Sequence, residues 1–286
     1  KRMGKKNLIC ESGAGQHYSA TAAVAAKFGI PLIGVMGEVD IKRVNQNIIK
    51  AKHYGAKLKA VPGTLKEAIT DAIKTWITNP DYYYVCGSAV SSFPFPKIVQ
   101  FAQSIIGKEI REQCLEQEKK LPNMIIGCVG GGSNFIGSIH EFLDEPNIKK
   151  IGVEAAETAA LTHGTPNIMQ GMKSYMLASS DGSKSLGGSS LGAGIQYFGV
   201  GPQHSYLKDQ GAVTYTSATD KEILNAYKVV AQTEGISSAL EPMAAAAEVL
   251  KQAKGKPKDF IIVLSLCGRG EKDLDTIEEH MGKDFE

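Results

Sequence analysis

The segment CVGGGSN at residues 128–134 places three consecutive glycines after a run of apolar residues. That run, MIIGCV at 124–129, has the length and composition of a strand covered on both faces of a sheet. Glycine allows φ > 0 and lets backbone N–H groups approach a ligand closely. Where a strand leads into a helix, such N–H groups form a site for an anionic oxygen cluster. The segment therefore predicts an α/β fold in which this loop binds a phosphate.

Two further loops share this arrangement. The apolar run at 7–11 leads into SGAGQH at 12–17, and IIVLSL at 261–266 leads into CGRG at 267–270. For any one such loop, a tight turn that needs small residues is the alternative explanation. Three of them after three strands favour a ligand site, because ligands collect at the carboxyl ends of parallel strands. A dinucleotide is disfavoured because GGGSN does not match GxGxxG, and a nucleoside triphosphate because GxxxxGK[ST] is absent.

Apolar, β-rich runs alternate with helical stretches along the chain, which predicts mostly parallel sheets. We expect strands at 7–11, 31–36, 57–61, 82–86, 124–129, 151–155, 212–216 and 260–266. We expect helices at 19–28, 41–54, 65–77, 96–118, 134–143, 220–234 and 242–253. The segment 179–194 is rich in serine and glycine and is expected to be a long loop.

Composition excludes several classes of protein. The 286 residues carry a net charge of +2, without the basic surplus of a nucleic-acid-binding protein. Apolar runs stay well short of the roughly 20 residues that span a membrane. The five cysteines lack CxxC spacing, which predicts neither a disulfide framework nor a zinc site and favours a reducing compartment, the cytoplasm. The basic N-terminus has no long apolar segment typical of a signal peptide, and we expect the chain to begin inside a domain.

Glu11 lies where the first strand meets its glycine loop. A carboxylate at this place is well positioned for proton transfer, and partial burial would raise its pKa toward the useful range. The alternative is a loop carboxylate that accepts backbone hydrogen bonds, and the sequence leaves both open.

Eight segments occur in a characteristic order: ESGAGQH, MGEVDIKRVNQNIIKAKHYGA, GSAVSSFPFP, CVGGGSNFIGSIHEF, GVEAA, GVGPQHSYL, TEGISSALE and CGRGEKDLDT. With them the chain resembles the tryptophan synthase β-subunit family from Lys1 nearly to its end. The resemblance implies a fold-type II enzyme with two three-layer αβα domains that uses pyridoxal 5'-phosphate to convert L-serine and indole to L-tryptophan and water. It further implies a mobile communication domain at 1–102 and a cofactor domain at 103–286, both incomplete, in a homodimer that partners an α subunit.

The resemblance also implies a role for each matching residue. Glu11 is the catalytic acid–base group. The cofactor-binding residues are Gly130, Gly131, Gly132, Ser133 and Asn134 at the phosphate, Gly87, Ser88 and Glu241 near the ring, and Cys267 where the family has a serine facing the pyridine nitrogen. The substrate-binding residues are Ser12, Gly13, Ala14, Gly15, Gln16 and His17 at the carboxylate, with Gln196 and Arg43 forming the pair that closes the site. A monovalent cation is expected near Gly130, Tyr197 and Gly199.

Several positions depart from the family pattern. The family's Schiff-base lysine matches no lysine here and falls upstream of Lys1. Gln196 replaces an aspartate, so its ion pair with Arg43 becomes at best a hydrogen bond, at a cost of roughly 1–3 kcal/mol. Cys267 replaces a serine, and the bulk of Tyr18 is expected to narrow the site. A segment after Glu157 is shorter than in the family.

These departures keep two alternatives open. Gln196, Cys267 and the shorter segment also fit another fold-type II β-eliminase, such as a serine dehydratase. A missing lysine would fit a non-catalytic, degenerate paralogue that binds a partner.

Overall fold

The computed structural model describes residues 1–42, 44–179 and 184–285, which form two compact units, Lys1–Gly87 and Ser88–Glu286. The units divide at Gly87, earlier than the predicted functional boundary after residue 102. The reason is that helix α5 (Phe95–Gln103) packs against α7 (Ser133–Ile139) of the second unit. The functional boundary stays a prediction.

The first unit is built on a parallel four-stranded sheet in the order β3 (Lys57–Val61), β2 (Leu32–Gly37), β1 (Asn7–Glu11), β4 (Tyr82–Tyr84). Its helices are α1 (Gln16–Phe28), α2 (Glu38–Ile41), α3 (Asn45–His53) and α4 (Leu65–Thr78). Helices α1 and α3 pack against each other, and α4 contacts all four strands.

Tyr18 of α1 is fully buried in the core of this unit, together with Cys10 and Met36. Its ring fills the space beside Gly34, where a Cβ would come within 2.2 Å of the ring. The added bulk at this position is therefore accommodated by the missing side chain of Gly34.

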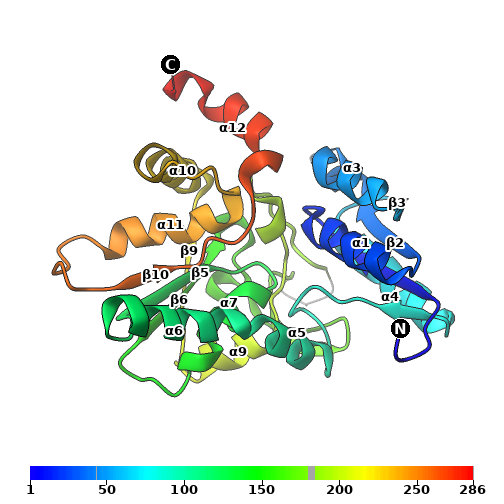
Figure 1. Ribbon diagram of the computed structural model, residues 1–286, viewed down its shortest axis with the longest axis horizontal. Coiled ribbons are helices and arrows are strands. Elements are labelled where there is room, and N and C mark those ends of the chain that lie inside the picture. Colours follow the sequence, from blue (N-terminus) through cyan, green and yellow to red (C-terminus); the bar gives the residue numbers. More distant parts are fainter. Residues whose placement is uncertain (43, 180–183, 286) are drawn as a thin grey trace. The chain divides into compact units, whose positions relative to one another are not determined.

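The second unit is also built on a parallel sheet, in the order β10 (Ile262–Leu264), β5 (Met124–Cys128), β6 (Lys149–Ala155), β9 (Thr214–Ala218). Successive side chains of β5 alternate between two cores. Met124, Ile126 and Cys128 pack with α11, whereas Ile125 packs with α7. Figure 1 shows α10 and α11 on one side of this sheet and α7 on the other. The apolar character of β5 along its whole length follows from this double coverage.

The remaining elements surround these sheets. The helices are α6 (Ile105–Glu118), α8 (Ala160–His163), α9 (Pro202–Asp209), α10 (Asp220–Glu234), α11 (Leu240–Gln252) and α12 (Leu274–Met281), with 3-10 turns at His140–Phe142, Ala156–Thr158, Ala193–Ile195, Gly270–Lys272 and Gly282–Asp284. An antiparallel hairpin joins β7 (Thr165–Met169) to β8 (Met172–Met176). Among the described residues, no helix combines the length and apolar character that crossing a membrane requires.

The fold-class prediction is confirmed, and each expected strand overlaps a strand of the structure. The expected helix at 96–118 is divided at Ser104 into α5 and α6. The expected helix at 41–54 is divided into α2 and α3. The hairpin β7–β8 was not predicted.

Candidate active site

The glycine loop between β5 and α7 has its carbonyl groups anchored to the protein. Gly131 O accepts a hydrogen bond from Gly201 N at 3.1 Å, and Gly132 O is 2.8 Å from Nε2 of His204. In a trans peptide the C=O of one residue and the N–H of the next point in opposite directions. The Gly132 N–H therefore points away from Gly201, and the Ser133 N–H points away from His204.

The same loop leaves its N–H groups available. Within the described part of the chain, the amides of Gly130, Gly131, Gly132, Ser133 and Asn134 donate no hydrogen bond to protein. The buried Asn134 Oδ1 also has no hydrogen-bond partner there, while its Nδ2 donates to Cys128 O at 3.3 Å. Gly132 is buried and the other four residues are partly exposed, so these amides are open to water or to a ligand. A row of unpaired donors therefore fits the phosphate of pyridoxal phosphate, the group that the sequence predicted for this loop.

His204 is the residue that holds this loop, and the sequence analysis gave it no role. Its Nε2 faces the carbonyl of Gly132, which only accepts, so Nε2 carries the proton and Nδ1 accepts from Tyr215 OH at 2.8 Å. Complete burial lowers the pKa of His204 to about 4, so the ring is neutral at neutral pH. Its ring also stacks on Phe135, with centroids 5.9 Å apart. In the sequence, the one signal for this histidine was its place in the motif GVGPQHSYL.

Ser88, which the resemblance assigns to the cofactor ring, lies next to Gly131 of the glycine loop. Its Oγ accepts a hydrogen bond from Val90 N at 3.0 Å. A Cβ on Gly131 would come within 2.3 Å of this oxygen and 3.0 Å of Val90 Cγ2. The close approach explains why the middle position of the loop has no side chain.

Cys267 follows β10 and meets Cys128 at the end of β5. Their Sγ atoms are 3.5 Å apart, and Glu241 at the start of α11 is near enough for its charge to act on both thiols. Both cysteines are free. The partner thiol of Cys128 was not foreseen from the sequence.

Glu241 belongs to a buried charged cluster. Lys272 Nζ lies 2.9 Å from Glu241 Oε1 and 2.7 Å from both carboxylate oxygens of Asp273, and its side chain is 3% exposed. Although desolvation acts in the opposite direction, the two carboxylates raise the pKa of Lys272, which therefore stays charged. Glu241 Oε1 also accepts from Gly194 N at 2.7 Å, whereas Oε2 is buried without a partner in the described part of the chain. That oxygen is a candidate contact for the cofactor ring.

In the first unit, Glu11 ends β1 as a buried carboxyl group, 3% exposed. Ile9 pairs with Tyr84, so Tyr84 and Glu11 share one face of the sheet, and the Tyr84 side chain hydrogen-bonds to Glu11. Burial raises the pKa of Glu11, with His17 and Tyr84 acting in the opposite direction. Burial and the charge of Glu11 raise the pKa of Tyr84, so the phenol keeps its proton and donates. This environment suits a group that holds and releases a proton during a reaction.

Several contacts fix the backbone of the predicted substrate loop at 12–17. Gly15 caps α1 at φ 73°, and Asn47 Nδ2 donates to Ala14 O at 2.9 Å. His17 Nε2 donates to Val85 O at 2.8 Å, and its ring lies against Gly87. Gly87, which the resemblance assigns to the cofactor ring, thus contacts His17 of this loop, and Asn47 supports the loop.

Two further predictions concern the pair that closes the site and the cation site. Gln196 follows a 3-10 turn and its Nε2 donates to Gly188 O at 3.3 Å. Arg43 lies outside the described residues. Tyr197 donates to Gln170 at 3.2 Å, and Gly199 pairs with Met176. The closing pair and the cation near Gly130 stay predictions.

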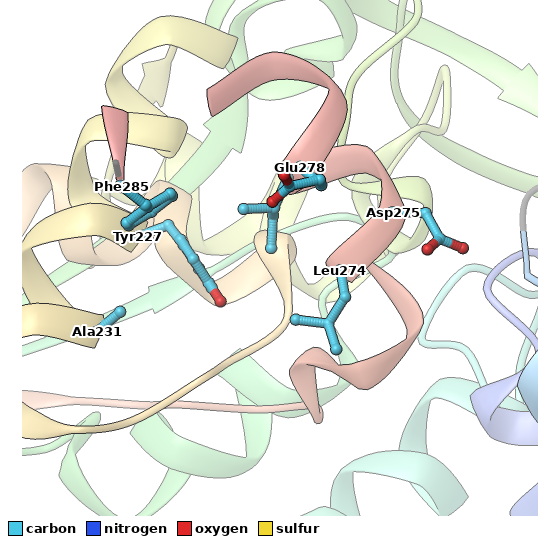
Figure 2. Close-up of a pocket in the computed structure, with 7 residues that line it drawn as sticks. Tyr227, Ala231, Leu274, Asp275, Glu278 and Phe285 are labelled. Carbon is cyan, nitrogen blue, oxygen red and sulfur yellow. The ribbon is translucent and has the colours of Figure 1, made fainter. Parts of the chain in front are cut away.

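A separate pocket of about 440 Å³ lies between α10 and α12, and Figure 2 shows its lining. Tyr227 and Phe285 meet edge to face there, with ring centroids 6.5 Å apart. The rest of the lining comes from Ala231, Leu274, Asp275, Ile277 and Glu278. None of the predicted site residues contributes to this pocket, so it is distinct from the cofactor residues.

Comparison with known proteins agrees with this geometry. The sequence profile of the family described as "Pyridoxal-phosphate dependent enzyme" matches residues 1–268. A relative named "Tryptophan synthase beta chain", from Allorhizobium ampelinum strain S4, is 46% identical over 294 aligned positions. The alignment covers 99% of this chain and 72% of the relative. A match of this extent, on a chain whose glycine loop offers unpaired amides to a phosphate, shows that the chain belongs to the pyridoxal-phosphate-dependent enzyme family.

Proposed function

We propose that this chain catalyses β-replacement, in which L-serine and indole give L-tryptophan and water. The observation that carries the proposal is the 46% identity, over 99% of the chain, to a tryptophan synthase β chain. The buried Glu11, with its raised pKa, supplies the proton-transfer group that the reaction needs.

The cofactor residues of this proposal belong to the second unit, except Gly87, which is the last residue of the first. The amides of the glycine loop hold the phosphate, with Ser133 and Asn134 adding side-chain contacts. Glu241 and Ser88 would contact the ring, and Cys267 would be the partner of its nitrogen. When bound, pyridoxal phosphate supplies an electron sink for negative charge at the substrate Cα.

Glu11 transfers the protons that accompany bond breaking and bond formation at the substrate Cβ. Because burial raises its pKa, the carboxyl group holds a proton while L-serine is bound and donates it to the departing hydroxyl oxygen. The resulting carboxylate then accepts the proton that indole loses when it bonds to the same carbon. Tyr84 orients Glu11 through its hydrogen bond, so the proton is exchanged from a fixed position.

The loop at 12–17 holds the substrate carboxylate in this proposal. Its backbone is rigid because Asn47 anchors Ala14 and His17 is anchored to Val85. The resemblance assigns the closing of the site to Gln196 and Arg43, and this role is part of the proposal. A monovalent cation bound by backbone oxygens near Gly130, Tyr197 and Gly199 completes the site.

The proposal extends to assembly and location. Phe93 and Phe101, next to and within α5, are 86% and 79% exposed, and Ile105 at the start of α6 is 54% exposed. Large apolar side chains exposed this close together favour a protein partner, and we propose a second copy of the chain. We further propose an α subunit as partner and a cytoplasmic location, in keeping with the free cysteines.

The experiment is a product analysis of the natural protein supplied with pyridoxal phosphate and L-serine, with and without indole. We expect tryptophan in the presence of indole. Pyruvate and ammonia at equal rates in both reactions, without tryptophan, would instead identify a serine dehydratase. The absence of all these products from protein with bound cofactor would identify a non-catalytic paralogue.

A further inference from the structure

Two thiols meet at the ends of neighbouring parallel strands. Cys128 closes β5, Cys267 follows β10, and their sulfur atoms are 3.5 Å apart although the residues are 139 positions apart in sequence. We propose that Cys128 and Cys267 form a reactive dithiol that reduces a small-molecule disulfide and closes to an intramolecular disulfide.

The two thiols differ in access. Cys128 is 1% exposed in the core between β5 and α11, whereas Cys267 is only partly buried. A disulfide that arrives from solvent therefore meets Cys267 first. Cys128 is placed to react with the product of that encounter, because its sulfur already touches that of Cys267.

The two thiols also differ in proton affinity. The hydrogen bond between them lowers the pKa of Cys267, while the same bond, together with burial, raises the pKa of Cys128. The thiolate is the nucleophile in thiol–disulfide exchange, so the more exposed thiol is also the more reactive one.

The segment that carries Cys267 can supply the movement that bond formation needs. A disulfide requires the sulfurs to approach to about 2.05 Å. Strand β10 ends at Leu264, so Cys267 lies in irregular backbone, just before Gly268 at φ 97°. Cys128 is fixed inside a central strand, and we expect Cys267 to move toward it.

The reaction balances as two exchanges. The Cys267 thiolate attacks one sulfur of a disulfide RSSR, which gives a Cys267–SR mixed disulfide and releases RS⁻. The Cys128 sulfur then attacks Cys267 Sγ, its proton passes to a departing thiolate, and the Cys267–SR bond breaks. The protein dithiol loses two electrons and two protons, and RSSR becomes two RSH. Oxidised glutathione is a disulfide of this class.

Bound cofactor should compete with this chemistry, a step that rests on the proposed function. If Cys267 faces the ring nitrogen, pyridoxal phosphate covers the thiol that reacts first. At a concentration of roughly 100 times its Kd, the cofactor leaves about 1% of the protein free and should slow the oxidation about 100-fold.

The test treats the natural protein, freed of cofactor, with oxidised glutathione, then alkylates the remaining thiols and maps the peptides by mass spectrometry. We expect a peptide pair joined through Cys128 and Cys267, formed about 100-fold more slowly when the cofactor is present. Cys128→Ala should stop at glutathione bound to Cys267. Cys267→Ser should leave the Cys128 thiol intact. Cys114→Ser, on α6, is the matched control and should form the link at the normal rate.

Three outcomes would overturn the proposal. The link does not form in cofactor-free protein, the Cys128 thiol is lost equally fast in Cys267→Ser, or the cofactor leaves the rate unchanged. The readout is independent of catalysis. Protein that forms the link but makes no tryptophan counts against the proposed reaction alone.

Discussion

Replacing Gly132 by alanine should weaken cofactor binding by an amount that the loop geometry determines. Gly132 has φ 94°, and an added Cβ would come within 2.2 Å of the His204 ring. An alanine in left-handed backbone costs about 1–2 kcal/mol. Moving the His204 ring breaks its hydrogen bond to Gly132 O, which keeps its bond from Ile136 N, and leaves the buried Nε2–H donor of His204 unpaired, which costs roughly 1–3 kcal/mol more.

Gly235→Ala is the matched control. Gly235 ends α10 at φ 65°, and nothing lies within 4 Å of its missing Cβ, so this change adds backbone strain without a clash. The difference between the two variants therefore isolates the cost of displacing His204. If the loop must return to its native position to hold the phosphate, about 1–3 kcal/mol corresponds to a roughly 5- to 150-fold higher Kd.

Equilibrium dialysis with pyridoxal phosphate measures both affinities, and chemical denaturation measures both free energies of unfolding. We expect Gly235→Ala to bind the cofactor like the unchanged protein. Equal affinity of the two alanine variants would refute the assignment of the loop geometry to phosphate binding. Equal unfolding free energies would refute the role of His204 in holding the loop.

Three further changes test other parts of the site. Glu11→Gln should lower the rate of tryptophan formation at least roughly 10²-fold while the cofactor absorbance persists; loss of that absorbance would make Glu11 structural. His204 has a pKa of about 4 folded and an ordinary value of 6.5. The unfolded chain therefore binds more protons in that window, and roughly 3 kcal/mol of stability present above pH 6.5 should disappear as the pH falls to about 4. His204→Gln should remove that slope in acid denaturation, and an unchanged slope would contradict the neutral ring. Gly131→Val should abolish cofactor binding in dialysis because its side chain would collide with Ser88 and Val90, and unchanged affinity would contradict the position of the loop.

A strand could be predicted from the sequence where its pattern of apolar residues matches the burial of those residues in the structure. Strand β5 is apolar throughout because α11 covers one face and α7 the other. The hairpin β7–β8 was missed because its turn is Gln170–Gly171, with φ of 46° and 78°. Two positive φ values are typical of a type I′ turn, but the sequence signal for that turn is Asn-Gly or Asp-Gly.

The candidate site was predictable only where one short segment contains it. The glycine loop is such a segment, and its role follows from the missing side chains. His204 lies 72 positions from Gly132, and Cys267 lies 139 positions from Cys128. Their contacts depend on the order of strands in the sheet and on the place of α9 beside it, which local patterns do not encode.

Because the glycine loop has no charged side chain, the residues that hold its backbone in place become important for binding. Residues 130–134 include no lysine or arginine, so in the proposed site the loop would bind a phosphate through N–H dipoles. Dipoles lose strength with misorientation more steeply than a mobile ammonium group does, because a hydrogen bond weakens rapidly once its angle is lost. Affinity in such a site depends on how well each peptide plane is fixed. Gly201 and the neutral His204 each fix one plane through its carbonyl oxygen. We therefore expect the residues that determine cofactor affinity to include buried groups, such as His204, that do not contact the cofactor.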